Sequence, residues 1–139
     1  QGLQRPLGYI LGTSDTAAYT AWFNQHWRPA AQALYGGTEG CRSPTEEATR
    51  RLFSQDLTFP PWVEAYPGHI HIDILPEAQG GGWGRKLMDA MSRRFAEKGC
   101  KGFHLGVSAA NEGGIAFYRR YGMQELATES WGLVFGKLL

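Results

Sequence analysis

The sequence predicts an α/β fold in which strands and helices alternate and at least two strands run parallel. Residues 69–75 alternate strictly between apolar and polar side chains, which is the pattern of a strand with one polar face. A glycine-rich loop and an amphipathic helix connect this strand to an apolar strand at 102–108, and such connections usually join parallel strands. With 42% hydrophobic and 19% charged residues, the 139-residue chain has enough apolar material for one compact domain over residues 1–139.

Before the glycine-rich loop, the sequence predicts one strand and a helical insertion. The apolar segment 7–12 is bounded by proline and polar residues, which indicates a strand. Segment 13–60 indicates helices, of which the first starts near Thr16 and is kinked or restarted at Pro29. A capping box beginning at Ser43 starts the second. The aromatic residues of this region are expected to form a satellite core, or else to line a pocket for an acceptor: Trp22, Phe23, Trp27, Tyr35, Phe53 and Trp62.

After the loop, the pattern predicts two more helices and a hairpin. The first helix starts near Gly84 and has one apolar face. Asn111 is suited to cap a short helix that ends before Gly122, and segments 123–128 and 131–138 have the composition of a β-hairpin.

Charge and cysteine content exclude several classes of function. The chain has 14 Lys and Arg against 13 Asp and Glu, and a formal charge of +1 makes no electrostatic case for a nucleic-acid partner. Cys41 and Cys100 lie far apart, so we predict neither a disulfide scaffold nor a metal site. No apolar run approaches the roughly 20 residues of a membrane span, and we expect no membrane partner and a cytoplasmic location. Because the chain begins with Gln1 and soon becomes apolar, we expect that something has been trimmed from its front.

The glycines are concentrated where a ligand would meet the backbone. Gly80, Gly81, Gly82 and Gly84 account for four of the 19 glycines, between a strand and the start of a helix. Glycine permits positive φ and close approach, and the first amides of a helix favour an anion. A flexible strand-to-helix turn is the alternative. The Gly-Lys-Ser/Thr of a Walker loop is absent, and Leu87 and Arg85 stand where a dinucleotide fingerprint needs glycine.

Two motifs together resemble the GNAT superfamily of N-acetyltransferases. Gln79-x-x-Gly82-x-Gly84 is similar to the family's Q/R-x-x-G-x-G/A pyrophosphate loop. The second motif, Asn111-x-x-Gly114-x-x-Phe117-Tyr118-x-x-x-Gly122-Met123, is similar to the N-x-x-A-x-x-hydrophobic-Y-x-x-x-G-F signature. It departs from that signature at Gly114 and Met123. Within the superfamily, the chain most resembles bacterial acetyltransferases related to the acetyltransferase-like C-terminal domain of O-GlcNAcase.

The resemblance implies a fold and a cosubstrate. The fold is a mixed, mostly antiparallel twisted sheet with a central, splayed pair of parallel strands and flanking helices, here with a helical insertion before the cofactor-binding strand. The cosubstrate is acetyl-coenzyme A, with its pyrophosphate on the loop and its pantetheine along the strand end. The residues implied in binding are Ile74, Leu75, Gln79, Gly80, Gly81, Gly82, Trp83, Gly84, Arg85, Asn111 and Tyr118.

The same resemblance implies direct acetyl transfer to an amine through a ternary complex. Tyr118 occupies the position of the general acid, with a tyrosine of the core as the alternative interpretation. The polar face of the strand offers the base, in the order His71, Asp73 and then His69, with an ordinary strand residue as the alternative interpretation of each histidine. Asn111 has the purely structural alternative of a helix cap.

Two questions stay open at this point. The acceptor is a small-molecule or protein amine, and a catalytically inactive module with a structural, interaction or coenzyme A-binding role is the alternative function. The family normally begins with a strand, two helices and a further strand, and these elements are missing here. The resemblance therefore implies one of two things. Either the chain is a fragment, or the inserted helices and a partner subunit in a homodimer form the wall of the acceptor site.

Overall fold

The computed structural model describes residues 5–37 and 39–139, which form two compact units. One unit comprises the chain up to Asp15 together with Pro61–Leu139, and the other comprises Thr16–Pro60. The second unit covers most of the segment predicted as a helical insertion. Among the described residues, no helix has the length and apolar content that crossing a membrane requires.

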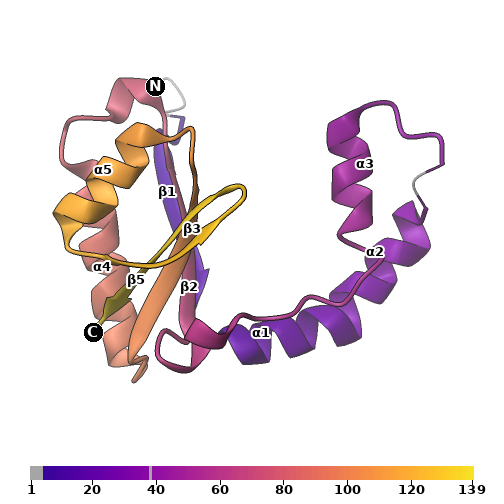
Figure 1. The fold of residues 1–139 in the computed structure, drawn as a ribbon, viewed down its shortest axis with the longest axis horizontal. Helices are drawn as coiled ribbons and strands as arrows, with labels where there is room; N and C mark the ends of the chain where they lie inside the picture. Colours follow the sequence, from indigo (N-terminus) through magenta and orange to yellow (C-terminus); the bar gives the residue numbers. More distant parts are fainter. Residues whose placement is uncertain (1–4, 38) are drawn as a thin grey trace. The chain divides into compact units, whose positions relative to one another are not determined.

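Within the described residues, the first unit is built on a five-stranded sheet with the order β1-β2-β3-β5-β4 (Figure 1). The strands are β1 (Gly8–Thr13), β2 (Gly68–Ile74), β3 (Gly102–Ser108), β4 (Gln124–Glu129) and β5 (Gly132–Leu138). The pair β2 and β3 is parallel, and the other neighbours are antiparallel. The predicted α/β class, with a mixed and mostly antiparallel sheet around a parallel pair, is confirmed.

Two helices cover one face of this sheet, α4 (Trp83–Glu97) and α5 (Glu112–Tyr121) (Figure 1). Apolar side chains recur at helical spacing on α4, so Met88 and Phe95 both point into the core. They meet side chains of the sheet, of which Phe103 and Phe135 are completely buried. The core of the first unit therefore lies between the two helices and the sheet.

The alternation predicted for residues 69–75 is present in β2. Ile70 and Ile72 contribute to the core beneath α4, whereas His71 and Asp73 are exposed on the opposite face. His69 shares that opposite face and is half-buried. Short 3₁₀ turns flank the strand, η2 (Pro61–Glu64) before it and η3 (Pro76–Ala78) after it.

The second unit contains α1 (Thr16–Trp22), the π-helical turn η1 (Phe23–Trp27), α2 (Arg28–Tyr35) and α3 (Pro44–Arg51). The helix changes its form at Phe23, and the π-helical turn gives way to α2 at Arg28, one residue before Pro29. Ser43 Oγ caps α3 by accepting from Glu46 N–H at 3.1 Å, as predicted.

The aromatic residues of this region are divided between the two units. In the second unit, the ring of Trp27 stacks on Phe23 at 4.8 Å and meets Phe53 at 5.3 Å, which is the packing expected of a satellite core. Trp22 is half-exposed. Trp62 belongs to the first unit, where its ring lies edge-on to His104 at 6.3 Å, so including it in the satellite core was wrong.

Candidate active site

The two parallel strands separate soon after they begin. The register pairs Gly68 with Phe103 and His69 with His104, and these are the only pairs among the described residues of β2 and β3. Yet β2 continues to Ile74 and β3 to Ser108. We call this divergence the fork. It leaves backbone groups on the facing edges without strand partners, and such groups can bind an extended ligand as an added strand.

The end of β2 directs one predicted binding residue toward the fork and the other away from it. Leu75 N–H donates to Leu7 O at 2.8 Å, on the side of β1. Because successive residues of a strand alternate, the backbone groups of Ile74 point to the other edge, which faces the fork. The Ile74 carbonyl accepts from Gln79 Nε2 at 2.9 Å. Gln79 therefore ties the glycine loop to the end of β2, and the Leu75 amide is already bonded to Leu7, the residue before β1.

The glycine loop has the backbone conformation that its sequence indicates. Gly80 and Gly82 adopt φ values of +79° and +77°, in the left-handed region that side chains disfavour. A Cβ atom at either position would meet nothing within 4 Å, so the space above the loop is open. The first helical bond here runs from Lys86 N–H to Gly82 O at 3.1 Å. The amides of Trp83, Gly84 and Arg85 precede it, and the first amides of a helix have no intrahelical partner.

Close packing and positive charge support the same loop. A Cβ atom at Gly84 would lie 3.2 Å from the ring of Phe117, so glycine lets the start of α4 approach α5. The Arg85 guanidinium lies 5.3 Å from the ring centre of Tyr121, and Lys86 Nζ lies 4.3 Å from that of Trp83. Two cations on the first turns of α4 thus add to the positive end of the helix dipole.

Asn111 acts as a helix cap. Its Oδ1 accepts from Gly114 N–H at 2.8 Å. A Cβ atom at Gly114 would approach Asn111 Nδ2 to 2.8 Å, so the glycine found in place of the family's alanine leaves room for this cap. The structural interpretation of Asn111 accounts for its Oδ1. Within the described residues, Nδ2 makes no hydrogen bond to the protein.

Tyr118 is both a core residue and a candidate acid. The residue is 8% exposed, and its ring packs against Phe117 at 5.3 Å and Phe135 at 5.6 Å. Within the described residues, its hydroxyl makes no hydrogen bond. The hydroxyl oxygen is also not among the fully buried polar atoms of these residues that lack a partner, so the hydroxyl is accessible at the surface. Burial raises the pKa of Tyr118 above its ordinary value, and the charge of Asp73 raises it further. Tyr118 is therefore protonated at neutral pH, as a proton donor must be.

The polar face of β2 contains a hydrogen-bonded pair joined by a third residue. His71 Nε2 contacts Asp73 Oδ2 at 2.9 Å, and the Tyr9 O–H donates to the same oxygen at 2.8 Å. The hydrogen bond from Tyr9, and then that from His71, lower the pKa of Asp73 below its ordinary value. The side chains of His71 and Asp73 are 61% and 63% exposed, so both are open to a ligand on this face.

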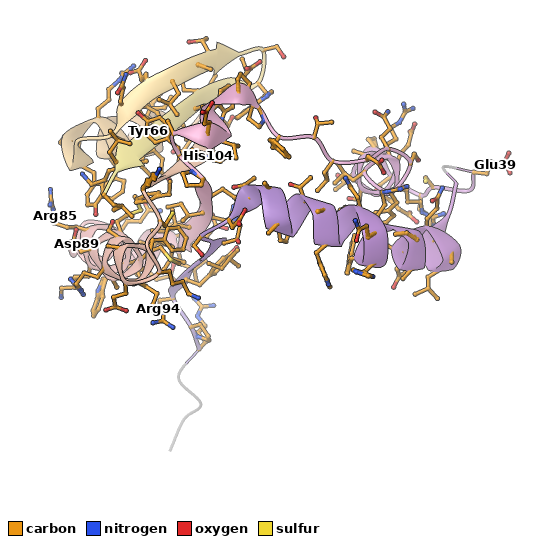
Figure 2. The ribbon with its side chains drawn as sticks, turned by 90° about the horizontal axis from the view of Figure 1, so that it is seen from below. Glu39, Tyr66, Arg85, Asp89, Arg94 and His104 are labelled. Carbon is orange, nitrogen blue, oxygen red and sulfur yellow. The ribbon has the colours of Figure 1, made fainter. Side chains whose placement is uncertain are left out.

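His69 lies apart from this pair. Its ring is 5.9 Å from that of His104, at the last paired position before the fork. Burial lowers the pKa of His69, and His104 lowers it further. Burial also lowers the pKa of His104, whose Nδ1–H donates to Tyr66 O at 2.8 Å (Figure 2). Figure 2 shows Tyr66 and His104 side by side, and Arg85 away from them on α4. Two neutral imidazoles thus fill the base of the fork.

An aromatic ring covers β3 on the same face as these histidines. Gly106 follows His104 by two residues, so both lie on the face opposite the helices. A Cβ atom at Gly106 would come within 2.6 Å of Trp131 Cη2, so the indole lies against the backbone of β3. His69 and His104 are the last paired residues of β2 and β3. His71 and Gly106 each follow them by two residues, so they lie on opposite sides of the fork. Trp131 therefore flanks the fork opposite His71.

The structure gathers most of the predicted residues around the fork: the loop from Gln79 to Arg85 at one end, Tyr118 on the helix side, and the polar side chains of β2 on the open face. Sequence reasoning missed Tyr9, His104 and Trp131. The glycine at 106, inside a strand, was a signal of close approach. The described residues contain no cluster of three or more His, Cys, Asp or Glu suited to a metal ion.

Comparisons with known proteins agree with this geometry. Residues 52–123 match the model of the Acetyltransferase (GNAT) family. The crystal structure of SsHAT is 36% identical over 95% of this chain, with a TM-score of 0.79, and the chain covers 66% of its length. Another crystal structure, described as an acetyltransferase, is 20% identical, with coverages of 95% and 62% and a TM-score of 0.55. The PaiA N-acetyltransferase of Thermoplasma acidophilum, in complex with coenzyme A, is 12% identical, with coverages of 94% and 99% and a TM-score of 0.50.

Proposed function

Since the chain belongs to the GNAT family of acetyltransferases, we propose that it is an N-acetyltransferase that transfers the acetyl group of acetyl-coenzyme A directly to an amine in a ternary complex. The observation that carries the proposal is the fork, with the left-handed glycine loop at the end of β2 and the Tyr118 hydroxyl within electrostatic range of Asp73. A relation to the acetyltransferase-like domain of O-GlcNAcase, a cytoplasmic location and a homodimer stay predictions.

The residues present fit the cosubstrate. The loop and the helix start offer three consecutive amides without an intrahelical partner, open space above Gly80 and Gly82, and the nearby cations Arg85 and Lys86. Together these features suit a pyrophosphate. The edge of β2 at Ile74 suits the amide groups of the pantetheine arm. In this arrangement the Gln79 side chain holds the Ile74 carbonyl or releases it to the ligand.

The side chains around the fork supply the two proton transfers that the reaction needs. When bound, acetyl-coenzyme A supplies a thioester carbonyl carbon, to which the amine nitrogen forms a bond while the carbon–sulfur bond breaks. His71 accepts the proton that the amine loses, with Asp73 stabilising the imidazolium. Tyr118 donates its proton to the departing thiolate, and solvent returns the protons.

Binding of the cosubstrate tests the first half of the proposal. In calorimetric titrations, we expect acetyl-coenzyme A to bind wild type and Gly82→Val to weaken binding roughly tenfold or more, because the added side chain enters the anion site. Gly99→Val is the matched control, since Gly99 has a similar φ of +74° and equally open space, at the far end of α4. Equal weakening in both variants, or no binding to wild type at millimolar ligand, would contradict the proposed cradle.

Transfer to an amine tests the second half. A panel of amines is incubated with acetyl-coenzyme A and the protein, and release of the free thiol is followed. We expect thiol release to depend on both the amine and the protein. Cosubstrate binding without transfer to any amine would instead support the inactive coenzyme A-binding module.

A further inference from the structure

Tyr9 lies on β1, outside the motifs that predicted the site, and its hydroxyl contacts the candidate base. We propose that Tyr9 is a positioning residue, which holds the Asp73 carboxylate so that Asp73 orients His71 with its Nδ1 open to the amine. This inference rests on the proposed function, because it assigns the arrangement of the proton acceptor in that reaction.

The hydrogen bonds define the direction of each donor. An ionised Asp73 can only accept, so both Tyr9 O–H and His71 Nε2–H must donate to its Oδ2, at 2.8 and 2.9 Å. Neutral His71 therefore carries its proton on Nε2 and has its lone pair on Nδ1. Within the described residues, Nδ1 makes no hydrogen bond. His71 thus presents a proton acceptor to the open face, backed by a carboxylate.

The backbone places the three side chains together. Tyr9 and Asp73 are directly paired across the antiparallel strands β1 and β2, so their side chains share one face. His71 precedes Asp73 by two residues on that face, and its ring lies 5.8 Å from that of Tyr9. The sheet register, and not a loop conformation, therefore defines this arrangement.

Exposure explains why a third residue is needed. The His71 and Asp73 side chains are more than half exposed, and exposed pairs of this kind hold each other weakly. The second hydrogen bond, from Tyr9, restricts rotation of the carboxylate. Other titratable groups around the pair are His69 on β2, His104 on β3 and Tyr118 on α5.

The test compares two variants that each lose one hydroxyl. Tyr9→Phe removes the bond to Asp73, and Tyr121→Phe removes a bond of the same length, 2.8 Å, from Tyr121 to Asp89. For Tyr9→Phe we expect kcat for acetyl transfer to fall roughly tenfold or less, with the KM for acetyl-coenzyme A unchanged, because only orientation is lost. For Tyr121→Phe we expect no such fall. In an Asp73→Asn background, Tyr9→Phe should have no further effect, since Tyr9 acts through Asp73.

A second measurement is independent of activity. Titration of the Asp73 carboxyl by carbon-13 NMR should show a higher pKa in Tyr9→Phe than in wild type, and an unchanged pKa in Tyr121→Phe. Wild-type kcat in Tyr9→Phe, or an Asp73 titration that does not move, would overturn the positioning role. If wild type transfers no acetyl group, the proposed function fails and the base assignment fails with it, while the NMR titration still decides whether Tyr9 holds Asp73.

Discussion

At the scale of the residue, the proposed acid and base lie in opposite environments. The ring of Tyr118 is buried in the core, while His71 and Asp73 are mostly exposed on the other face of the sheet. Burial disfavours the phenolate, which keeps Tyr118 protonated, and exposure lets His71 exchange a proton with solvent. An ordinary tyrosine can thus donate the proton and an ordinary histidine can accept one, because the sheet places the first in the core and the second in contact with solvent.

The charge of Asp73 should affect Tyr118 through space. Asp73 raises the pKa of Tyr118, so removing that charge should lower it. An acid that must be protonated gives a rate that falls as the pH rises through its pKa, so in Asp73→Asn we expect the basic limb of the kcat/KM profile to move to lower pH. Asp89→Asn, a neutralised carboxylate on α4, is the control in which the limb should stay. An unmoved limb in Asp73→Asn would remove Tyr118 as the donor.

At the scale of the element, the capping side chain of Asn111 limits which residues fit at the start of α5. Asn111 caps the helix at Gly114, and two glycines follow each other in the first turn. Of these, Gly114 lies against the Asn111 side chain, whereas a Cβ atom at Gly113 would meet only Asn111 Oδ1 at 4.0 Å. The cap therefore depends on one glycine and not on the other.

These two glycines allow a matched comparison of stability. Gly113→Ala should raise the free energy of unfolding by up to about 1 kcal/mol, because alanine favours the helix. Gly114→Ala should give no such gain, because displacing Asn111 costs about 1 kcal/mol of capping. Denaturant unfolding of both variants checks this. In an Asn111→Ala background the two substitutions should become equivalent, and a persistent difference there would contradict the role of the cap.

At the scale of the whole molecule, the two histidines at the base of the fork should make stability depend on pH. Burial lowers the pKa of both His69 and His104, so the folded state binds a proton less readily than the unfolded chain. The contribution of these neutral histidines to stability is fully present above the ordinary histidine pKa of about 6.5. It is lost as the pH falls from that value toward the lowered pKa of the folded state. We expect the melting temperature to drop between pH 7.5 and 5.

A variant of His104 isolates this effect. His104→Asn keeps a donor for the Tyr66 carbonyl but cannot titrate, so its melting temperature should change less over the same range. His26→Asn, in the second unit, is the control and should behave as wild type. The carboxyl groups with lowered pKa values, Asp73 and Glu46, titrate only at more acidic pH and do not contribute to this window. A change of melting temperature in His104→Asn as large as that of wild type would contradict the explanation, because only His69 still titrates there.

Local patterns in the sequence predicted most of the fold and part of the site. Alternation in β2, the capping residues Ser43 and Asn111 and the glycines of the loop act over a few positions, so they can be read along the chain. Tyr9 could not be assigned in this way, because its role depends on the register between β1 and β2. These strands are neighbours in the sheet, but in the sequence the whole second unit lies between them. Trp131 likewise meets Gly106 only through tertiary packing.

The strand order has a consequence for how the chain folds. Strand β5 follows the other four described strands in the sequence, yet it lies between β3 and β4 and pairs with β3 along its full length. Until residues 132–138 are available, one edge of β3 has no partner and the other has already diverged from β2. Nascent chains that stop short of β5 therefore expose both edges of an apolar strand, and pairing between chains competes with folding at that stage.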